Sequence, residues 1–427
     1  MTKRAIVWFR NDLRLSDNES LQKALEENEE VIPLFILEDR ILSEDTYGFV
    51  KTGPFRLRFL IESVISLREE LTRRSAGLII ATGDPVNILG KVSAFYNTSR
   101  IYASKEVTSE EILTEKKLAD KFELSLYWGS LLYHPEDITF TKEEIPDIFT
   151  HFRKSVEKDS FVRPIIKAPE KIPVPGNFKD AGLADILQLK PGIKADKRSV
   201  ITFRGGPVEG HKRLKHYIWD TKSINRYKYT RNGLIGSDYS GKFSAWLANG
   251  SLSAREIYWQ IKKFEEAYKS NISTYWMVFE LIWRDYFKYV ALKYGNKIFS
   301  YKGIRGIDPK LKPDKDKLNR WINSSTGEKF VDANMKEIML TGYMSNRGRQ
   351  NVASYLVKDM KVDWRMGAAW FESMLIDYDP CSNYGNWMYV AGVGNDPRED
   401  RYFNVKKQAE RYDPEGEYVN LWLDGHA

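Results

Sequence analysis

The stretch AIVWFRNDLRLSDNESLQKALEENEEVIPLFIL, residues 5–37, decides the fold class of the first third of the chain. Two short apolar runs, Ala5–Phe9 and Val31–Leu37, flank a segment of helix-like composition at Asn18–Asn28. Apolar runs of this length are typical of buried parallel strands, which need a crossover between them. The stretch therefore predicts the first strand–helix–strand unit of a parallel α/β sheet.

The same alternation continues outward to about residue 128. Three further strand-like runs lie at Gly77–Ala81, Arg100–Ala103 and Glu123–Trp128, and three helix-like segments at Pro54–Arg74, Pro85–Phe95 and Ser109–Phe122. This order predicts a Rossmann-like, doubly wound parallel sheet with right-handed crossovers. The turn after the first strand, RNDLRLSDN, contains no glycine, so neither a dinucleotide fingerprint nor a phosphate loop is present there.

Helical periodicity replaces this alternation in the second half of the chain. The segment STYWMVFELIWRDYFKYVALKYG predicts a long helix that begins with Ser273 as its N-cap and stops at Gly295. Between the two halves, KAPEKIPVPGNFKDAG is rich in Pro, Gly and Lys and is typical of an exposed connector. We expect an α/β domain at residues 1–135, a connector at 136–206 and a larger all-α domain at 207–427.

Composition narrows the class of protein. The chain has 427 residues, 42% of them hydrophobic and 29% charged, which is typical of a soluble globular protein. No apolar run reaches the length of a membrane span, and the start of the chain has no signal-peptide pattern. The single cysteine, Cys381, excludes an internal disulfide, so we expect a cytoplasmic protein, and a monomer. The net charge of +7 permits a polyanionic partner without requiring one.

Tryptophan and histidine are distributed unevenly. Ten of the twelve tryptophans lie at or after Trp219, which suggests stacking surfaces or a redox-active region as well as packing. Histidine is absent from residue 217 through residue 425. We therefore expect no metal site and no imidazole catalysis in the helical domain, unless His426 or the pair His211 and His216 folds into it.

Two clusters of polar residues are candidate binding sites. Ser240, Gly241, Lys242, Phe243 and Ser244 precede a helix and could present N–H groups and hydroxyls to a phosphate, although a capped helix after a polar loop gives the same pattern. The second cluster is Glu280 and Arg284, four residues apart within an aromatic helix face. They form either an ordinary ion pair or a functional pair, because buried charges must be compensated.

A third cluster combines arginines with carboxylates. Asn346, Arg347, Arg349 and Gln350 stand at one predicted helix start, where the helix dipole already favours anions. The carboxylates of Asp377 and Asp379 are candidate partners, and a purely structural Arg–Asp bridge is the alternative. They lie in DYDPCSNYGNWMY, which has the composition of a loop. Without a histidine or an activated nucleophile, hydrolysis by this carboxylate pair is disfavoured.

Over nearly its full length the chain resembles the photolyase/cryptochrome family, and its DASH branch in particular. The segments that carry the resemblance are WFRNDLRLSDNESL, FSAWLANGSLSAREIY, ELIWRDYF, MSNRGRQNVASYLVKDM and DWRMGAAWFESMLIDYDPCSNYGNWMYVAGVGNDPREDRYFN. The resemblance implies that the helical domain binds FAD. The residues implied in FAD binding are Tyr227, Ser240, Gly241, Lys242, Phe243, Ser244, Arg284, Asn346, Arg347, Asp377, Asp379 and Asn383. Arg347 is expected to pair with Asp377.

The resemblance also implies a path for electrons. Trp387, Trp364 and Trp321 fall on three tryptophans that pass an electron from the protein surface to the excited flavin. Asn383 matches an asparagine that faces flavin N5, where an amide can donate or accept a hydrogen bond. Each tryptophan also has a packing role.

DNA contacts follow from the same resemblance. Glu280 and Trp283 match residues that contact the flipped pyrimidine dimer, and the other implied contacts are Tyr343, Asn346, Arg349, Gln350 and Tyr389. Cyclobutane photolyases carry a tryptophan and a methionine where this chain has Tyr389 and Gln350. A smaller ring and a polar amide hold an apolar dimer less well, and extruding a base from a duplex costs a few kcal/mol, so single-stranded DNA is the expected substrate. Ser345 stands where some relatives have a histidine, which disfavours repair of six–four photoproducts.

The segment YASKEVTSEEI resembles the part of the family's N-terminal domain that binds a methenyltetrahydrofolate antenna, with Glu106 as the implied contact. An acidic first helical turn is the alternative explanation of this pattern. The family implies a blue-light-driven lyase that repairs cyclobutane pyrimidine dimers in DNA by electron transfer from reduced FAD. A photosensor without repair is the second possibility. A dark oxidoreductase fits poorly, because no nicotinamide-binding fingerprint is present.

Overall fold

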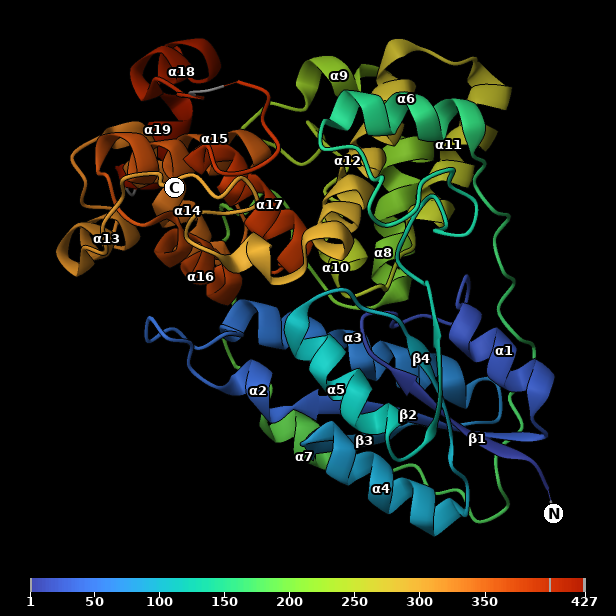
Figure 1. The fold of residues 1–427 in the computed structure, drawn as a ribbon. Coiled ribbons are helices and arrows are strands. Elements are labelled where there is room, and N and C mark those ends of the chain that lie inside the picture. Colours follow the sequence, from blue (N-terminus) through green and yellow to red (C-terminus); the bar gives the residue numbers. More distant parts are fainter. Residues whose placement is uncertain (1, 399–400, 425–427) are drawn as a thin grey trace.

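The computed structural model describes residues 2–398 and 401–424. An α/β domain and a larger helical domain lie against each other (Figure 1). In the described part of the α/β domain, β1 (Arg4–Phe9), β2 (Glu30–Glu38), β3 (Ile79–Gly83), β4 (Arg100–Ser104) and β5 (Glu123–Tyr127) form a five-stranded sheet of order β3-β2-β1-β4-β5. All neighbouring strands are parallel, so the expected fold class of this domain is confirmed.

Helices cover both faces of the sheet because its strands are apolar on both sides. Val7 and Phe9 pack on one face against α1 (Glu19–Glu27) and α3 (Pro54–Thr72). Ile6 and Trp8 pack on the other face, against α4 (Pro85–Tyr96) and α5 (Ser109–Ala119). Alternate residues of one strand point to opposite faces, and both faces are buried, as a doubly wound sheet requires. The short helix α2 (Asp39–Leu42) follows β2 at the edge that faces the helical domain.

The segment between the two domains carries two helices, and its Pro-, Gly- and Lys-rich part, residues 167–182, is irregular and mostly exposed, as its composition predicts. Its helix α6 (Phe149–Asp159) packs in the helical domain, and α7 (Leu183–Gln188) packs beside β3. Between them the chain returns along the sheet, where the Val31 amide donates to the carbonyl of Pro173 at 2.9 Å. Ile172 is fully buried in the sheet core. Backbone hydrogen bonds and one apolar anchor therefore hold this segment despite its Pro, Gly and Lys content.

The rest of the described chain is helical, as expected from its periodicity. The helices are α8 (Pro207–Lys215), α9 (Tyr227–Thr230), α10 (Ser244–Ala248), α11 (Ala254–Tyr268), α12 (Ile272–Tyr294), α13 (Lys315–Ile322), α14 (Lys329–Thr341), α15 (Asn346–Ser354), α16 (Trp364–Met374), α17 (Pro380–Ala391), α18 (Val405–Tyr412) and α19 (Glu417–Leu423). Short π-helical turns extend α8 over His216–Asp220 and α15 over Tyr355–Asp359, and 3-10 turns lie at Ser223–Arg226 and Gly295–Phe299. None of the described helices is both long and apolar enough to cross a membrane.

Two sequence-based expectations about these helices are wrong. The N-cap of α12 is Asn271, whose side chain accepts from the amides of Ser273 and Thr274, and Ser273 is already inside the helix. The segment DYDPCSNYGNWMY is mostly helical, because Asp379 caps α17 by accepting from the Ser382 amide at 2.7 Å and Pro380 occupies the first turn. A capping Asp followed by Pro is a helix-start signal that outweighs the loop-like composition.

The long helix α12 joins the two domains. The carboxylate of Asp285 accepts hydrogen bonds from the amides of Leu132 and Tyr133, just after β5, at 2.9 Å. Burial raises the pKa of Asp285 to about 6, although these amides and Arg284 counteract it. One turn further on, the Lys288 ammonium pairs with Glu106 of the α/β domain at 3.0 Å. These buried contacts fix where α12 stands above the sheet.

Candidate functional site

A cavity of about 280 Å³ lies inside the helical domain. Its wall is built from the loop before α10, one face of α12, the start of α15 and the start of α17. Most of the residues expected to bind a ligand here do line it. They are Tyr227, Ser240, Gly241, Lys242, Phe243, Ser244, Glu280, Arg284, Tyr343, Asn346, Arg349, Asp377 and Asp379.

Asp377 is the centre of the polar part of this wall. Its Oδ2 accepts from the Ser244 hydroxyl at 2.6 Å and from Arg349 Nη2 at 2.9 Å. Its other oxygen, Oδ1, is buried and has no hydrogen-bond partner among the described residues. A buried carboxylate oxygen without a partner is costly, so a ligand that donates a hydrogen bond would be stabilised at this point.

The expected pairing of Arg347 with Asp377 is wrong, because Arg349 takes that place. Arg347 instead donates to Asn232 Oδ1 at 2.8 Å and to Gln408 Oε1 at 3.2 Å. Residues two apart on a helix point about 200° away from each other, so only one of these arginines can face the cavity. Burial opposes the charge of Arg349, but Asp377 raises its pKa above the ordinary value. The Arg349 side chain therefore points into the protein interior, where it also donates a hydrogen bond to the Met344 carbonyl.

The loop before α10 presents a buried cation and a close-packed glycine. The Lys242 ammonium donates to the Ser237 carbonyl at 2.8 Å and lies 3.3 Å from the centre of the Tyr239 ring. Burial, and to a lesser degree the nearby Arg213, hold the pKa of Lys242 well below its usual range. A Cβ atom at Gly241 would lie 2.5 Å from the Phe243 ring. A larger residue at position 241 would therefore collide with the Phe243 ring, and an anion in the cavity would favour the charged form of Lys242.

The two charges of α12 that line the cavity do not pair with each other. Glu280 forms an ion pair with Arg231, whereas the Arg284 guanidinium donates to the carbonyls of Ser130 and Leu247. The sequence analysis missed Arg231, because no local pattern connects it with a residue 49 positions later. Met277 and Leu281 also line the cavity and were missed. Their spacing to Glu280 and Arg284 follows one helix face, which is a signal that could have identified them.

Trp283, Tyr389 and Gln350 do not line the cavity, although all three were expected to contact the substrate. The Trp283 ring stacks on Phe149 with 3.6 Å between ring centres and an angle of 11° between their planes. Tyr389 meets Trp283 edge-on at 6.1 Å, and the Arg401 guanidinium lies 4.5 Å from the centre of the Tyr389 ring. Gln350 Oε1 is buried and has no partner among the described residues. The aromatic cluster of Phe149, Trp283 and Tyr389 begins at Trp283, one helical turn after Glu280, and so adjoins the cavity.

The three tryptophans expected to carry electrons are all in the core. Trp364 and Trp321 are fully buried, and Trp387 is 2% exposed. Trp387 and Trp321 are ring neighbours, with 6.2 Å between their centres. None of the three tryptophan side chains reaches the surface. Asn383 is also buried, does not line the cavity, and donates to the carbonyl of Ala368 at 3.0 Å.

A second, larger cavity of about 610 Å³ lies between the two domains. It shares Leu247, Ala248, Arg284 and Asp379 with the smaller cavity, so the two adjoin. Glu106 lines it, accepting from Asn11 at 3.1 Å beside its ion pair with Lys288. Burial would raise the pKa of Glu106, but Lys288 and Arg10 lower it below the usual value.

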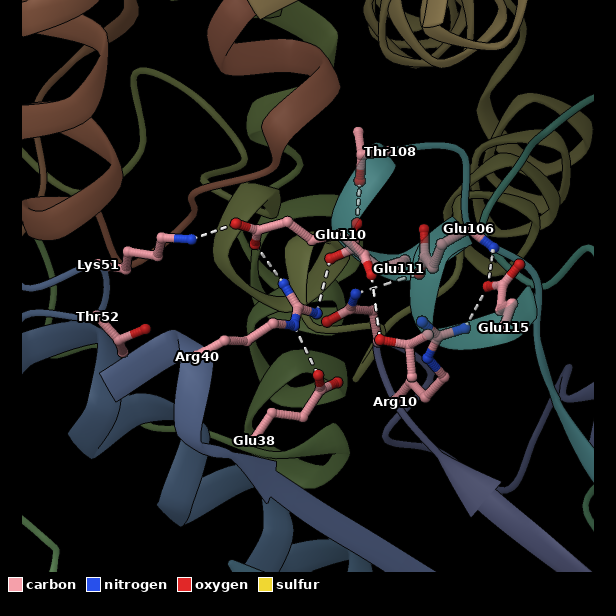
Figure 2. Close-up of polar contacts among 12 residues, drawn as sticks. Arg10, Glu38, Arg40, Lys51, Thr52, Glu106, Thr108, Glu110, Glu111 and Glu115 are labelled. Carbon is pink, nitrogen blue, oxygen red and sulfur yellow. Dashed lines mark hydrogen bonds and ion pairs between the residues drawn. The ribbon is translucent and has the colours of Figure 1, made fainter. Parts of the chain in front are cut away.

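Figure 2 shows the charged rim of this larger cavity. Arg40, in α2, donates to Glu38 at 2.6 Å, to Glu110 at 2.6 Å and to Glu111 at 2.9 Å. Lys51 forms an ion pair with the same Glu110. Deeper in the α/β domain, Arg10 pairs with Glu115 at 2.6 Å. Each of these rim carboxylates is therefore paired with a cation of the same domain.

The described residues contain no group of three or more His, Cys, Asp or Glu side chains that could hold a metal ion. His211 and His216 are engaged with Glu256 and Asp238, at 3.2 and 3.1 Å. His426, the other histidine considered in the sequence analysis, lies outside the described residues.

Comparison with known proteins points to one family. Residues 276–426 match the family model for the FAD binding domain of DNA photolyase, and residues 5–175 match the model for DNA photolyase. The chain is 46% identical to cryptochrome DASH of Synechocystis sp. over 424 residues, which cover 98% of this chain and 87% of that protein. It is 46% identical to cryptochrome DASH of Danio rerio over 434 residues, covering 99% and 83%.

Solved structures agree with this relationship. The crystal structure of a Synechocystis sp. cryptochrome superposes with a TM-score of 0.95 at 45% identity, covering 99% of this chain and 89% of that one. A class III photolyase of Agrobacterium tumefaciens gives a TM-score of 0.86 at 26% identity, covering 99% and 87%. With its parallel sheet, its helical FAD-binding domain and these relatives, the chain belongs to the photolyase/cryptochrome family, in the cryptochrome DASH branch.

Proposed function

We propose that this chain is a blue-light-dependent DNA lyase that splits cyclobutane pyrimidine dimers, mainly in single-stranded DNA. The observation that supports this most directly is the smaller cavity, whose buried Asp377 keeps one oxygen free for a ligand beside an aromatic cluster. FAD held there in its reduced form would supply the light-excited electron that splits the dimer, and would regain that electron afterwards. The protein's part is to bind, orient and exclude water.

The residues of the smaller cavity fit an FAD molecule by their chemistry. The hydroxyl of Ser240 and the guanidinium of Arg284 suit an anionic diphosphate. Met277, Leu281 and Met344 supply apolar wall for a flat ring system. The free oxygen of Asp377 can accept from an N–H or hydroxyl group of the cofactor.

The aromatic cluster beside the cavity supports a single-stranded substrate. Phe149 already covers one face of Trp283, and Tyr389 meets its edge rather than offering a second parallel surface. A base held by so little stacking surface gains little energy, whereas extruding it from a duplex costs a few kcal/mol. A dimer in a single strand avoids most of that cost.

Irradiation of dimer-bearing oligonucleotides tests this proposal. The protein with chemically reduced FAD is illuminated with blue light on single-stranded and duplex substrates of the same sequence, and the loss of dimers is measured. We expect loss in the single strand and much less in the duplex. A Trp387→Phe variant, reduced beforehand, should repair as well as the parent, because its FAD needs no electron from the protein. Unchanged dimers in single strands would refute the proposal.

A light sensor with little or no repair is the second candidate. The observation in its favour is again the close Trp283–Phe149 stack, which leaves less aromatic surface for a dimer. A sensor predicts full photoreduction of the bound FAD together with unchanged dimers on every substrate tested, so the same irradiation experiment separates the two functions. The cytoplasmic location and the monomeric state expected from the sequence remain predictions.

We also propose that the larger cavity holds methenyltetrahydrofolate as an antenna. Its volume suits a molecule of that size, and the carboxylate of Glu106 suits the amino and N–H groups of a pterin. One structural relative, an archaeal photolyase of Sulfolobus tokodaii at 29% identity, is described with two FAD molecules. The absorption spectrum of the purified protein discriminates the two chromophores, because folate adds a near-ultraviolet band and a second flavin only enlarges the flavin bands.

A further inference from the structure

Trp387, Trp364 and Trp321 are all buried, so they do not show at which residue an electron enters the protein. The ring contacts of Trp321 among the described residues go to Trp370, Phe371 and Trp387, at 5.4, 6.0 and 6.2 Å. All of these rings are buried, Trp370 being the most exposed at 4%. An electron that enters from solvent therefore cannot arrive through an exposed ring next to Trp321.

Trp364 has a different environment. Trp387 packs on the face of α16 that carries Trp364, because its Cη2 atom would lie 2.3 Å from a Cβ atom at Gly367, three residues after Trp364. On its other side, the Trp364 indole N–H donates to the backbone carbonyl of Tyr301 at 3.1 Å. The Tyr301 ring lies 5.2 Å from the guanidinium of Arg365, the residue directly after Trp364. Trp364 thus stands between Trp387 and Tyr301.

Tyr301 has the three properties that the surface end of an electron path needs: access to solvent, a fixed ring and a nearby proton acceptor. It is half-buried, so its phenol is accessible to a solution reductant. Its hydroxyl donates to the Leu311 carbonyl at 2.6 Å and accepts from the Leu311 amide at 2.8 Å, which holds the ring in place. Burial and the neighbouring carboxylate of Asp308 raise the pKa of Tyr301. Asp308 is exposed, so it can take the phenolic proton and pass it to water.

Tyr384 is the alternative neighbour, with 6.1 Å between its ring centre and that of Trp364. It lines the interdomain cavity. Burial raises its pKa well above the usual value. An oxidised tyrosine must lose its hydroxyl proton, and burial disfavours that loss at Tyr384 more strongly than at Tyr301. Oxidation of Tyr384 is therefore disfavoured.

We propose that electrons enter this protein at Tyr301 and reach the flavin through Trp364 and Trp387, with Trp321 a packing residue outside the path. This inference rests on the proposed light-driven chemistry of the bound FAD. Each event moves one electron from Tyr301 to the flavin, and the Tyr301 O–H bond breaks as its proton passes to Asp308 or water. A thiol reductant in solution then returns one electron and one proton to the tyrosyl radical. Two such events oxidise two thiols to one disulfide.

Electron paramagnetic resonance of the illuminated holoprotein tests the inference without measuring repair. We expect a tyrosyl signal that narrows when the protein carries ring-deuterated tyrosine. In Tyr301→Phe that signal is lost and a tryptophanyl signal replaces it, while photoreduction with thiol slows several-fold. The matched control is Tyr402→Phe, which removes the hydroxyl of another partly exposed tyrosine that bonds Asp359, and it should leave the signal intact.

The remaining variants separate failure of the inference from failure of the proposed function. A tyrosyl signal that survives in Tyr301→Phe, or that disappears in Tyr384→Phe, overturns the inference, as does loss of photoreduction in Trp321→Phe. Photoreduction that is unaffected in Trp387→Phe contradicts the whole electron path and not only its surface end. Equal FAD content in all variants shows that each has folded, and the deuterium narrowing in the parent protein is informative even if a variant does not fold.

Discussion

The rim of the larger cavity and the polar wall of the smaller cavity differ in how their charged groups are satisfied. At the rim of the larger cavity, Arg40 and Lys51 neutralise Glu38, Glu110 and Glu111 within the α/β domain (Figure 2). In the smaller cavity, Asp377 is buried with one oxygen unpartnered among the described residues. Burial of the Lys242 ammonium in the same cavity disfavours its charged form.

This difference indicates which cavity depends on its ligand. The ion pairs at the rim of the larger cavity are already made within the protein, so these groups need no further partner. A buried carboxylate and a buried ammonium are costly unless something in the cavity compensates them. We therefore infer that the smaller cavity is built around an obligatory cofactor, and that the larger one can remain without its chromophore at little loss of stability.

Asp377→Ala should have the largest effect. It leaves the Arg349 guanidinium and the Ser244 hydroxyl without their shared acceptor, and removing one partner of a buried pair typically costs about 3–5 kcal/mol. We expect a loss of this size in the free energy of unfolding, measured by urea denaturation, together with loss of bound FAD. Asp377→Asn keeps an acceptor but removes the charge, so its effect should be smaller. An Asp377→Ala protein that purifies with its full flavin content would contradict the inference.

The sequence predicts the helices and strands that surround this site better than it predicts which side chains pair within it. The strands were predicted to within two residues of their observed ends. Short apolar runs that alternate with helix-like segments are a strong sequence signal of buried parallel strands. Most of the cavity wall was also anticipated, through the resemblance to known proteins. The missed helix α17 carried its own start signal in Asp379 and Pro380, which composition alone obscured.

The pairings could not be derived from the sequence. Whether Arg347 or Arg349 faces Asp377 depends on the rotation of α15 about its axis, and only tertiary packing fixes that rotation. Arg231, the partner of Glu280, comes from a different segment of the helical domain. The burial of Trp321 likewise depends on how α13 packs against α16 and α17, which the amphipathic pattern of α13 does not specify.

The second prediction concerns Glu337 of α14, behind the wall of the smaller cavity. Its carboxyl is fully buried and accepts from the Tyr418 hydroxyl at 2.7 Å. Burial raises the pKa of Glu337 from 4.5 to about 7, against the effects of Tyr418, Lys242 and Arg349. Between these two values the folded protein holds a proton that the unfolded chain has released. Stability should therefore fall as the pH rises through this window, by up to about 3 kcal/mol.

The Glu337→Gln variant isolates this effect, because glutamine keeps an acceptor for Tyr418 but does not titrate. We expect the difference in unfolding free energy between parent and variant to change between about pH 4.5 and pH 7 and to be constant above that window. A difference that is the same at every pH would show that Glu337 does not hold a proton in the folded state.

The third prediction concerns the floor of the larger cavity. Glu106→Gln removes the charge that Lys288 pairs with, although Lys288 keeps a hydrogen bond to the Ser130 hydroxyl at 2.8 Å. We expect the near-ultraviolet band of the antenna to be lost while the flavin bands remain, with a stability loss of about 1–2 kcal/mol. Reconstitution with methenyltetrahydrofolate and absorption spectroscopy measure the first effect. Retention of the antenna band at full occupancy would remove Glu106 from the binding residues.

The smallest effect is expected at the rim of the larger cavity, for Glu110→Gln. Arg40 keeps Glu38 and Glu111 when this charge is removed, and the Glu110 side chain is 47% exposed, so solvent screens what is lost. The unfolding free energy should change by about 0.5 kcal/mol or less, and the change should vanish at high salt. Arg40→Met is the contrasting variant. It removes the cation that Glu38, Glu110 and Glu111 share, and so leaves three carboxylates close together. If Glu110→Gln destabilised the protein as much as Asp377→Ala does, the larger cavity would need its charges as the smaller one does, and the contrast between them would fail.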